Sequence, residues 1–332
     1  MKLLLCFVLS ASAALAAEGY HVIQKIHIGG SGTWDRQTLD ESARRLYVSN
    51  DNRVVVVDID AGKLVGEIPG VGIHGVAVAP DLGRGFISNG QSDDVTIFDL
   101  KTLKPLGQVK AGSDPGPIVF EPKTARVFAF NLATEDKTAT VIDARTGEAA
   151  GTVLLGGKGT GAVADGSGKI WINLQITNED WNVSSEMGVV DAEKLTLLRH
   201  NSISPCDRPT GLAMDAKNRR VFSVCGNSKM AVVDADSGKM IGTVAIGKLA
   251  SGTGFDPGAG LAFSADGGDG TMTVVGEANG TFEVVEKVPT ARGSRMLSVD
   301  PKTHNVYLPA VEYAPSSTTP VADSFMVLVV GK

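Results

Sequence analysis

The stretch Arg44–Gly70 reads "RRLYVSNDNRVVVVDIDAGKLVGEIPG". Two apolar runs are followed by a more polar one, and short polar turns separate them. Runs of this length, rich in β-branched residues and bounded by Asn, Asp and Gly, predict strands joined by tight turns. The stretch therefore predicts three strands of a small antiparallel sheet.

The same pattern recurs along the chain. The aspartate after the most apolar run returns at steps of 41, 44, 48 and 43 residues, at Asp58, Asp99, Asp143, Asp191 and Asp234. A first strand precedes each unit, as in "HGVAVAP", "GLAMDA" and "LAFSAD", with "WDRQTLDES" a looser match in the first unit. The sixth unit is weaker, and a seventh reaches the end of the chain. Four strand-like runs at this spacing are typical of a β-propeller blade. We predict an all-β, seven-bladed β-propeller with four-stranded antiparallel blades, forming one domain over residues 18–332.

The N-terminal run "HVIQKIHIGG", His21–Gly30, resembles the fourth run of each unit. The seventh unit stops after "SFMVLVVGK", which supplies only its third strand. An open array of blades would expose free strand edges. We therefore predict that the N-terminal strand completes the last blade and closes the ring.

The motif "LYVSN…VVVVDIDAGKLVGEI" resembles the YVTN-type β-propeller repeat family, over essentially all of the mature chain. The resemblance implies a secreted or surface propeller, and this group includes bacterial periplasmic proteins. Related propellers serve as lactonases, as subunits of quinone-linked dehydrogenases and as binding scaffolds, and a periplasmic propeller of this type has been linked to DNA. Because these proteins share a fold, the fold alone does not choose among the activities.

Residues 1–17, "MKLLLCFVLSASAALAA", combine a charged start, an apolar stretch and a small-residue cleavage site. This pattern predicts a secretory signal peptide cleaved near Ala16–Ala17, and export to the periplasm or beyond. The apolar run is too short to span a bilayer, and no later run is long enough, so we predict no membrane span. In an oxidising compartment the two remaining cysteines, Cys206 and Cys225, predict one disulfide; two buried free thiols are the alternative.

The formal net charge is −6, from 31 basic and 37 acidic side chains. A net acidic chain argues mildly against tight nucleic-acid binding, which depends on neutralising phosphates, although a local basic patch is compatible with it. We expect a monomer whose partner is a protein or a small molecule, with nucleic acid disfavoured.

In a propeller the first strand of each blade lines the central channel, so the residues just before these strands should surround its entrance. Alignment places Asp35, His74, Gly116, Gly159, Thr210 and Arg295 at one level, with the sixth blade near Ala259. The candidate ligand-binding residues are Trp34, Asp35, His74, Asp114, Lys158, Arg208, Asp256, Arg292 and Arg295.

Each of these residue types allows two interpretations. His74 is a general base or metal ligand, or a histidine held by a backbone hydrogen bond. The three arginines clamp a carboxylate or phosphate, or form ion pairs with Asp35, Asp114 or Asp256. The Trp34 indole stacks on a ligand, or plugs one end of the channel.

A second level comes from the ends of the second strands, at Asn50, Asn89, Asn131, Leu174, Cys225 and Glu277. Calcium-dependent lactonase-type propellers use Glu, Asn and Asp in the channel, so the resemblance implies Glu277, Asn89 and Asn131 as candidate Ca²⁺ ligands. The alternative is that asparagine is favoured at strand ends because it bonds to nearby backbone. No other cofactor is evident.

Familiar catalytic motifs do not occur: the chain has no CxxC, HExxH or GxSxG. The glycine-rich "GGKGTG" at 156–161 lacks the spacing of a phosphate loop and a following helix. The sequence therefore predicts a binding or interaction scaffold that uses its channel and two longer loops, 175–185 and 311–323. A metal-assisted hydrolase in the channel and single-stranded nucleic-acid binding by an arginine rim are the alternatives.

Overall fold

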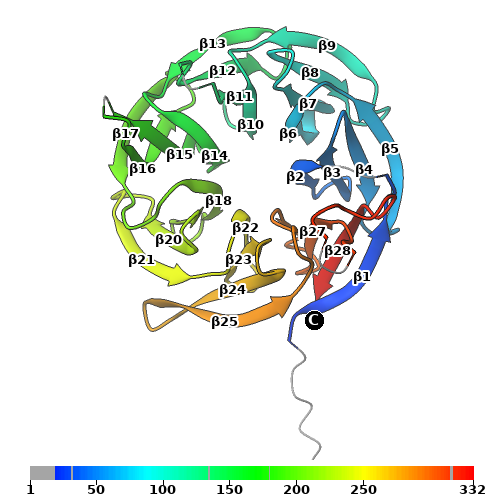
Figure 1. Cartoon of the computed structure of the whole chain (residues 1–332). Coiled ribbons are helices and arrows are strands. Elements are labelled where there is room, and N and C mark those ends of the chain that lie inside the picture. The colour runs from blue at the N-terminus through cyan, green and yellow to red at the C-terminus, as the bar shows by residue number, and fades with distance from the viewer. Residues whose placement is uncertain (1–18, 31–32, 134, 179, 315–316) are drawn as a thin grey trace, which may run out of the picture.

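The computed structural model describes residues 19–30, 33–133, 135–178, 180–314 and 317–332. The predicted signal peptide lies outside these residues and stays a prediction. The described strands form seven four-stranded antiparallel sheets arranged as blades around a central channel (Figure 1). The predicted seven-bladed propeller is confirmed. Within the described ranges, no helix has both the length and the apolar character needed to cross a membrane.

Each of the first three blades is built from consecutive strands, the innermost first. Blade one consists of β2 (Trp34–Asp40), β3 (Arg45–Asn50), β4 (Arg53–Asp58) and β5 (Lys63–Pro69). Blade two consists of β6 (Ile73–Ala79), the 3₁₀ turn η1 (Pro80–Leu82), β7 (Arg84–Asn89), β8 (Asp94–Asp99) and β9 (Pro105–Lys110). Blade three consists of β10 (Pro115–Glu121), β11 (Arg126–Asn131), β12 (Thr138–Asp143) and β13 (Ala149–Leu154).

The next three blades repeat this order. Blade four consists of β14 (Lys158–Ala164), β15 (Lys169–Thr177), β16 (Val183–Asp191) and β17 (Thr196–Ser202). Blade five consists of β18 (Pro209–Asp215), β19 (Arg220–Cys225), β20 (Lys229–Asp234) and β21 (Met240–Ala245). Blade six consists of β22 (Ala250–Asp256), β23 (Leu261–Asp266), β24 (Thr271–Ala278) and β25 (Thr281–Pro289).

Blade seven joins the two ends of the chain. It consists of β26 (Ser298–Val299), β27 (Val306–Ala310), β28 (Met326–Gly331) and β1 (His21–His27). Strand β1 pairs antiparallel with β28, so that His27 lies opposite Met326 (Figure 1). The N-terminal strand therefore is the outer strand of the last blade and closes the ring, as the sequence predicts.

The recurring aspartate that sets the repeat has a structural reason. The Asp58 carboxylate accepts the backbone N–H groups of Asp60 and Ala61, which fixes the turn between β4 and β5. The same turn forms at the other four positions, Asp99, Asp143, Asp191 and Asp234. An aspartate that caps its own turn is a strong local signal, so these five blades are found correctly from the sequence.

The core is divided among the blade interfaces. The described residues contain seven apolar clusters, one between each pair of neighbouring blades. Ile26 of the closing strand is buried in the cluster between blades seven and one, together with Trp34 and Phe325. Burying this apolar surface is the main term that holds each blade to the next.

The inner strands approach one another at glycines. A Cβ atom added at Gly161 would lie 1.8 Å from the carbonyl oxygen of Thr210, and one at Gly211 would lie 2.4 Å from that of Ser251. Both distances are shorter than any real contact, so these positions accept only glycine unless the backbone moves. The glycines let neighbouring inner strands draw together around the channel.

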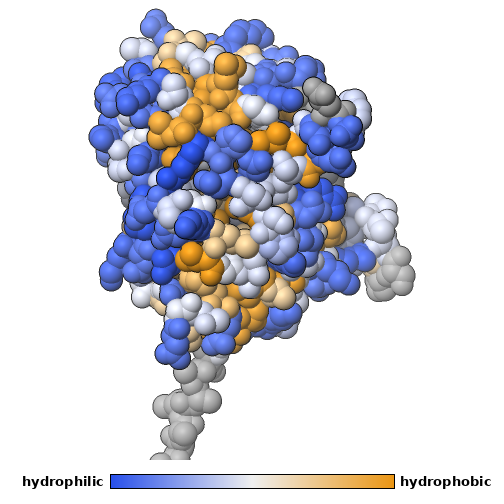
Figure 2. All heavy atoms as spheres, turned by 90° about the vertical axis from the view of Figure 1, so that its left-hand side faces the viewer, coloured by the Kyte–Doolittle hydropathy of each residue, from blue (hydrophilic) through white to orange (hydrophobic). Residues whose placement is uncertain are grey.

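The outer strands form the rim of the ring. Figure 2 shows the rim on the left of Figure 1, where apolar side chains (orange) form spots separated by hydrophilic ones. Exposed apolar residues on these strands include Leu154 of β13, Leu198 of β17 and Ile241 of β21. Scattered apolar side chains are ordinary on a protein surface and do not by themselves indicate an interface.

The predicted register of blade six is wrong. The run "LAFSAD", predicted as the first strand, is the second strand, β23, and the first strand is β22 with the sequence "ASGTGFD". Strand β22 carries no alternating apolar pattern, because it lies between the channel and the backbone of its neighbour. The shift displaces three assigned residues, Ala259, Asp256 and Glu277, from their predicted levels.

Candidate ligand site at the channel entrance

The inner strands begin at one face of the ring, which we call the entrance face; the opposite side is the far face. Six of the seven inner strands have a register shift near this beginning, as between Trp34 and Gln37 or between Ile73 and Gly75. A bulge re-aims the side chains within it and is common beside binding sites. Here the bulges contain Asp35 and His74, which line a cavity at the entrance.

A second repeated feature is the residue immediately before the inner strand, which we call the entrance position. Its backbone is left-handed in blades two, three, five and six, with φ of +60° at Gly72, +54° at Asp114, +47° at Arg208 and +52° at Leu249. Glycine adopts this conformation freely, whereas residues with a Cβ atom are strained in it. Three blades thus hold an acid, a base and an apolar side chain at the same left-handed position, which faces the channel entrance.

Two cavities lie at the entrance face. The acidic cavity, of about 700 Å³, is lined by residues that include Asp35, Asp51, His74 and Asp114. The arginine cavity, of about 570 Å³, is lined by Thr33, Trp34, Gln175, Arg208, Thr210, Gly226, Leu249, Ala250, Ser251, Gly267, Gly293, Arg295, Tyr313 and Pro320. Thr33, Trp34 and Arg295 line both cavities, so the two form one continuous mouth.

His74 bridges two carboxylates in the acidic cavity. Its Nδ1 lies 2.7 Å from Oδ2 of Asp35, and its Nε2 lies 3.0 Å from Oδ1 of Asp114. The hydrogen bond to Asp35 raises the pKa of His74, and this outweighs the opposing effect of burial. Both ring nitrogens donate, so neither is free to bind a metal or to accept a proton. The partners are side chains and not the backbone carbonyl that one interpretation of the sequence assumed.

Asp35 is held ionised by its surroundings. Burial alone would raise its pKa, but the hydrogen bond from His74 and the positive charges of Arg36, His74 and Arg295 lower it. The guanidinium of Arg36 lies deeper in the channel and donates to the carbonyl oxygen of Thr160 at 2.8 Å. Asp35 therefore remains a charged acceptor committed to His74.

The three predicted arginines are placed differently. Arg295 and Arg208 are exposed and line the arginine cavity. Arg292 stacks on the ring of Tyr313, with its Cζ 4.5 Å from the ring centroid, and also donates to the carbonyl oxygen of Ser317. Arg292 therefore stands beside the mouth, engaged with the long connection between β27 and β28.

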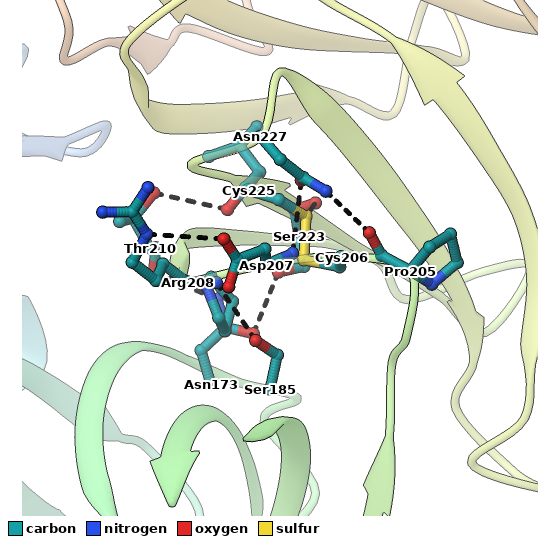
Figure 3. The surroundings of a disulfide bond; sticks show 12 residues. Asn173, Ser185, Pro205, Cys206, Asp207, Arg208, Thr210, Ser223, Cys225 and Asn227 are labelled. Atoms are coloured by element: carbon teal, nitrogen blue, oxygen red, sulfur yellow. Dashed lines mark hydrogen bonds and ion pairs between the residues drawn. A yellow bond between two sulfur atoms is a disulfide. The ribbon is translucent and has the colours of Figure 1, made fainter. Parts of the chain in front are cut away.

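Cys206 and Cys225 form the predicted disulfide, with their Cα atoms 5.5 Å apart. Figure 3 shows the bridge beside Arg208, at the start of β18. The Asn227 side chain adds two contacts, donating to the carbonyl oxygen of Pro205 at 2.8 Å and accepting the N–H of Asp207 at 3.2 Å. These links pin the loop that carries Arg208.

Two other candidate residues lie away from the mouth cavities or at the wrong face. Lys158 begins β14 at the entrance face, but it is not among the described residues that line the acidic cavity or the arginine cavity. Asp256 ends β22 at the far face, where it is fully buried and hydrogen-bonded to Nδ1 of His304 at 2.7 Å. Its assignment to the entrance is wrong because of the register shift in blade six.

The candidate calcium ligands are not brought together. Asn89 donates to Asp94 at 2.7 Å, and Asn131 donates to Thr138 at 2.8 Å, so each is bonded within its own blade. Glu277 lies at the far face, on β24, with its carboxylate 3.7 Å from Arg220.

The register shift explains this, because the second strand of blade six ends at Asp266 and not at Glu277. Within the described part of the chain, no group of three or more His, Cys, Asp or Glu residues is arranged to hold a metal ion.

Several residues that line the mouth are not among the predicted site residues, and four of them bear on its chemistry. Leu249 and Ser251 flank the start of β22, and they are not predicted because the sequence pattern places the first strand of blade six at "LAFSAD". Tyr313 lies in the predicted binding loop 311–323, although its residue type does not single it out, and Asp51 lies in a tight turn, where an aspartate gives no functional signal. The left-handed backbone that marks Leu249 is not visible in a sequence without a structure.

Comparison with known proteins supports the fold. No protein-family model matches the chain. No curated protein matches it by sequence. The solved structures that resemble it include a chain of the Kuenenia stuttgartiensis hydrazine synthase, with a TM-score of 0.70 and 17% identity over 84% of this chain and 92% of that one. U3-55K is similar with a TM-score of 0.72 and 10% identity, over 94% of this chain and 99% of that one. At these identities the likeness shows the β-propeller fold alone.

Proposed function

We propose that this protein is an exported, YVTN-type binding protein that takes its ligand at the channel entrance. The observation that carries the proposal is the continuous mouth formed by two cavities around Trp34 and Arg295. Its walls come from several blades, at bulges and at strained entrance positions. Concave sites with a few convergent polar groups are the usual places where proteins bind small molecules.

The surrounding loops support a recognition role for this face. The middle strands of blade four, β15 and β16, are nine residues long, and their hairpin carries Trp181, which is 81% exposed. The connection between β27 and β28 also lies at this face and supplies Tyr313 to the arginine cavity. Long loops on one face of a rigid scaffold often carry binding residues.

Export and family membership rest on the sequence. The first 17 residues have the pattern of a signal peptide, and the Cys206–Cys225 disulfide suits an oxidising compartment. The repeat motif supports the YVTN-type assignment. We propose that the exported protein acts as a monomer.

Binding is favoured over metal-assisted hydrolysis because the groups expected for catalysis are separated or occupied. Glu277 lies at the far face, whereas Asn89 and Asn131 end their strands at the entrance face. The nitrogens of His74 are both engaged by carboxylates. Calcium-dependent hydrolysis of dihydrocoumarin by the purified protein would overturn this ranking.

A thermal-shift panel tests the binding function. The probes are amino acids, di- and tripeptides, alkyl carboxylates and phosphates, an oligothymidylate and CaCl₂, each added to the wild type, Arg295→Glu and Lys217→Gln. Arg295 lines both cavities, whereas Lys217 is exposed on the turn after β18 at the far face.

We expect at least one probe to raise the melting temperature of the wild type and of Lys217→Gln, but not that of Arg295→Glu. A shift that survives in Arg295→Glu, or no shift with any probe, would contradict the proposal. A shift caused by the oligothymidylate alone would favour the nucleic-acid alternative.

A further inference from the structure

We propose that the arginine cavity binds an organic anion with an apolar body, such as an alkyl carboxylate or alkyl phosphate. The anionic group would lie between Arg208 and Arg295, and the apolar body against Trp34, Leu249 and Tyr313. This inference rests on the proposed function, because it names the ligand class of the same mouth.

The charge of the cavity is one-sided. Among the described residues that line it, the only charged ones are Arg208 and Arg295, and none is acidic. Arg295 makes no side-chain hydrogen bond or ion pair with the residues that the structure describes. Within the described ranges, Arg208 forms one ion pair, with its neighbour Asp207 at 3.5 Å, and its side chain is 68% exposed. An exposed pair of this kind is weak, so both guanidinium groups keep donors for a ligand.

The nearby acids Asp35, Asp51 and Asp114 line the acidic cavity and not the arginine cavity, and each is hydrogen-bonded to another residue. Asp35 lowers the local positive potential around Arg295, but its Oδ2 is committed to His74 at 2.7 Å. Asp114 also bonds to His74, on the side of the acidic cavity. The guanidinium fork matches carboxylate and phosphate oxygens with paired N–H donors, so an anion is the ligand group that these arginines suit.

The backbone of Arg208 is held in place before any ligand arrives. Its backbone lies in the left-handed region, the neighbouring Cys206 is bridged to Cys225, and its N–H donates to Oγ of Ser185 at 3.0 Å (Figure 3). Fixing a binding residue in advance reduces the entropy lost when the ligand binds.

The apolar part of the cavity includes an exposed leucine. Leu249 is 69% exposed and has a left-handed backbone, so it is both strained and largely without packing partners. It lies at the entrance position of blade six, the blade next to Arg208, and lines the cavity with Trp34, Tyr313 and Pro320. An apolar ligand body would cover these side chains and remove the exposed leucine from water.

The size of the cavity fits a small molecule and not a bare ion. Its volume of about 570 Å³ falls within the usual range for small-molecule sites. We therefore expect a ligand with several carbon atoms, and affinity that rises about fourfold for each methylene group buried.

Isothermal titration calorimetry tests the proposal with butanoate, hexanoate, octanoate, hexyl phosphate, hexanamide and inorganic phosphate. We expect affinity to rise along the carboxylate series, and hexanamide and inorganic phosphate to bind at least tenfold more weakly than hexanoate and hexyl phosphate, respectively. The stronger of hexanoate and hexyl phosphate shows whether the site prefers a carboxylate or a phosphate. Hexanamide binding as tightly as hexanoate would overturn the proposal.

Two variants and one control locate the ligand. Arg208→Gln should weaken hexanoate at least tenfold, and Lys217→Gln should not change it. Leu249→Gly should weaken hexanoate while leaving the melting temperature unchanged or higher, because glycine relieves the strained backbone. A purely structural Leu249 would give the opposite result, a lower melting temperature with unchanged affinity.

The outcome separates this inference from the proposed function. If the alkyl anions fail but another probe binds in a way that needs Arg295, the ligand class is wrong and the binding function stands. If no probe depends on Arg295, both are wrong.

Discussion

Weakening the contact by which the N-terminal strand closes the ring should measurably lower the free energy of unfolding. Ile26 is the one fully buried residue of β1, with 2% of its surface exposed. It packs in the interface between blades seven and one, in the cluster that includes Trp34 and Phe325. Replacing it with alanine removes buried methyl and methylene groups and leaves a cavity, which costs about 2–5 kcal/mol in a packed core. We expect Ile26→Ala to lower the free energy of unfolding by about 3 kcal/mol.

The same strand supplies a matched control. Ile23 of β1 is 45% exposed, so Ile23→Ala should cost less than about 1 kcal/mol. Urea unfolding followed by tryptophan fluorescence measures both variants, through the shift of the midpoint at an unchanged slope. Equal losses for Ile26→Ala and Ile23→Ala, or no loss for either, would refute the packing of β1 against the interface.

Three further predictions concern the channel and the entrance loop. Gly211→Ala places a Cβ atom 2.4 Å from a backbone carbonyl oxygen and should lower the free energy of unfolding by about 1–3 kcal/mol; an unchanged melting temperature would contradict the close approach. The double variant Cys206→Ser/Cys225→Ser opens a crosslink that spans 19 residues and should lose about 3 kcal/mol, whereas reduction by dithiothreitol should then leave the variant unaffected. The hydrogen bond to Asp35 raises the pKa of His74 in the folded protein. The stabilisation that protonated His74 gives to the fold is therefore fully present below the ordinary pKa of histidine, and it is lost as the pH rises through the raised pKa. The wild type should therefore exceed His74→Gln in free energy of unfolding by more at about pH 6 than at about pH 9, and a constant difference would count against the paired imidazolium.

The blades that the sequence predicts well are those with a strong local signal. Asp58 and its counterparts cap their own turns, so their spacing reports the repeat directly. The seventh unit lacks an outer strand, and the run at His21–His27 lacks a partner. Pairing the two predicts the closure of the ring. These features depend on local hydrogen bonds and on edge pairing, and both can be read from residue order.

The inner strand of blade six could not be predicted in this way. Its sequence "ASGTGFD" is short of apolar residues because Gly252 and Gly254 lie against the backbone and side chains of blade seven. Without an alternating pattern, the next run, "LAFSAD", takes its place in the alignment. For this reason Asp256 and Glu277 are wrongly predicted to lie at the channel entrance, whereas both lie at the far face.

The candidate site could be predicted in part, because the start of each inner strand marks the channel entrance. Trp34, Asp35, His74, Arg208 and Arg295 all line the mouth cavities. Which of them are engaged and which are free depends on contacts between blades, which residue order does not reveal.

A crystal structure of the protein grown with hexanoate tests the central claim most directly. The account predicts a molecule in the arginine cavity, with its carboxylate within hydrogen-bond distance of Arg208 and Arg295 and its chain against Leu249. An empty cavity at saturating hexanoate, or a molecule bound only at the far face, would contradict it.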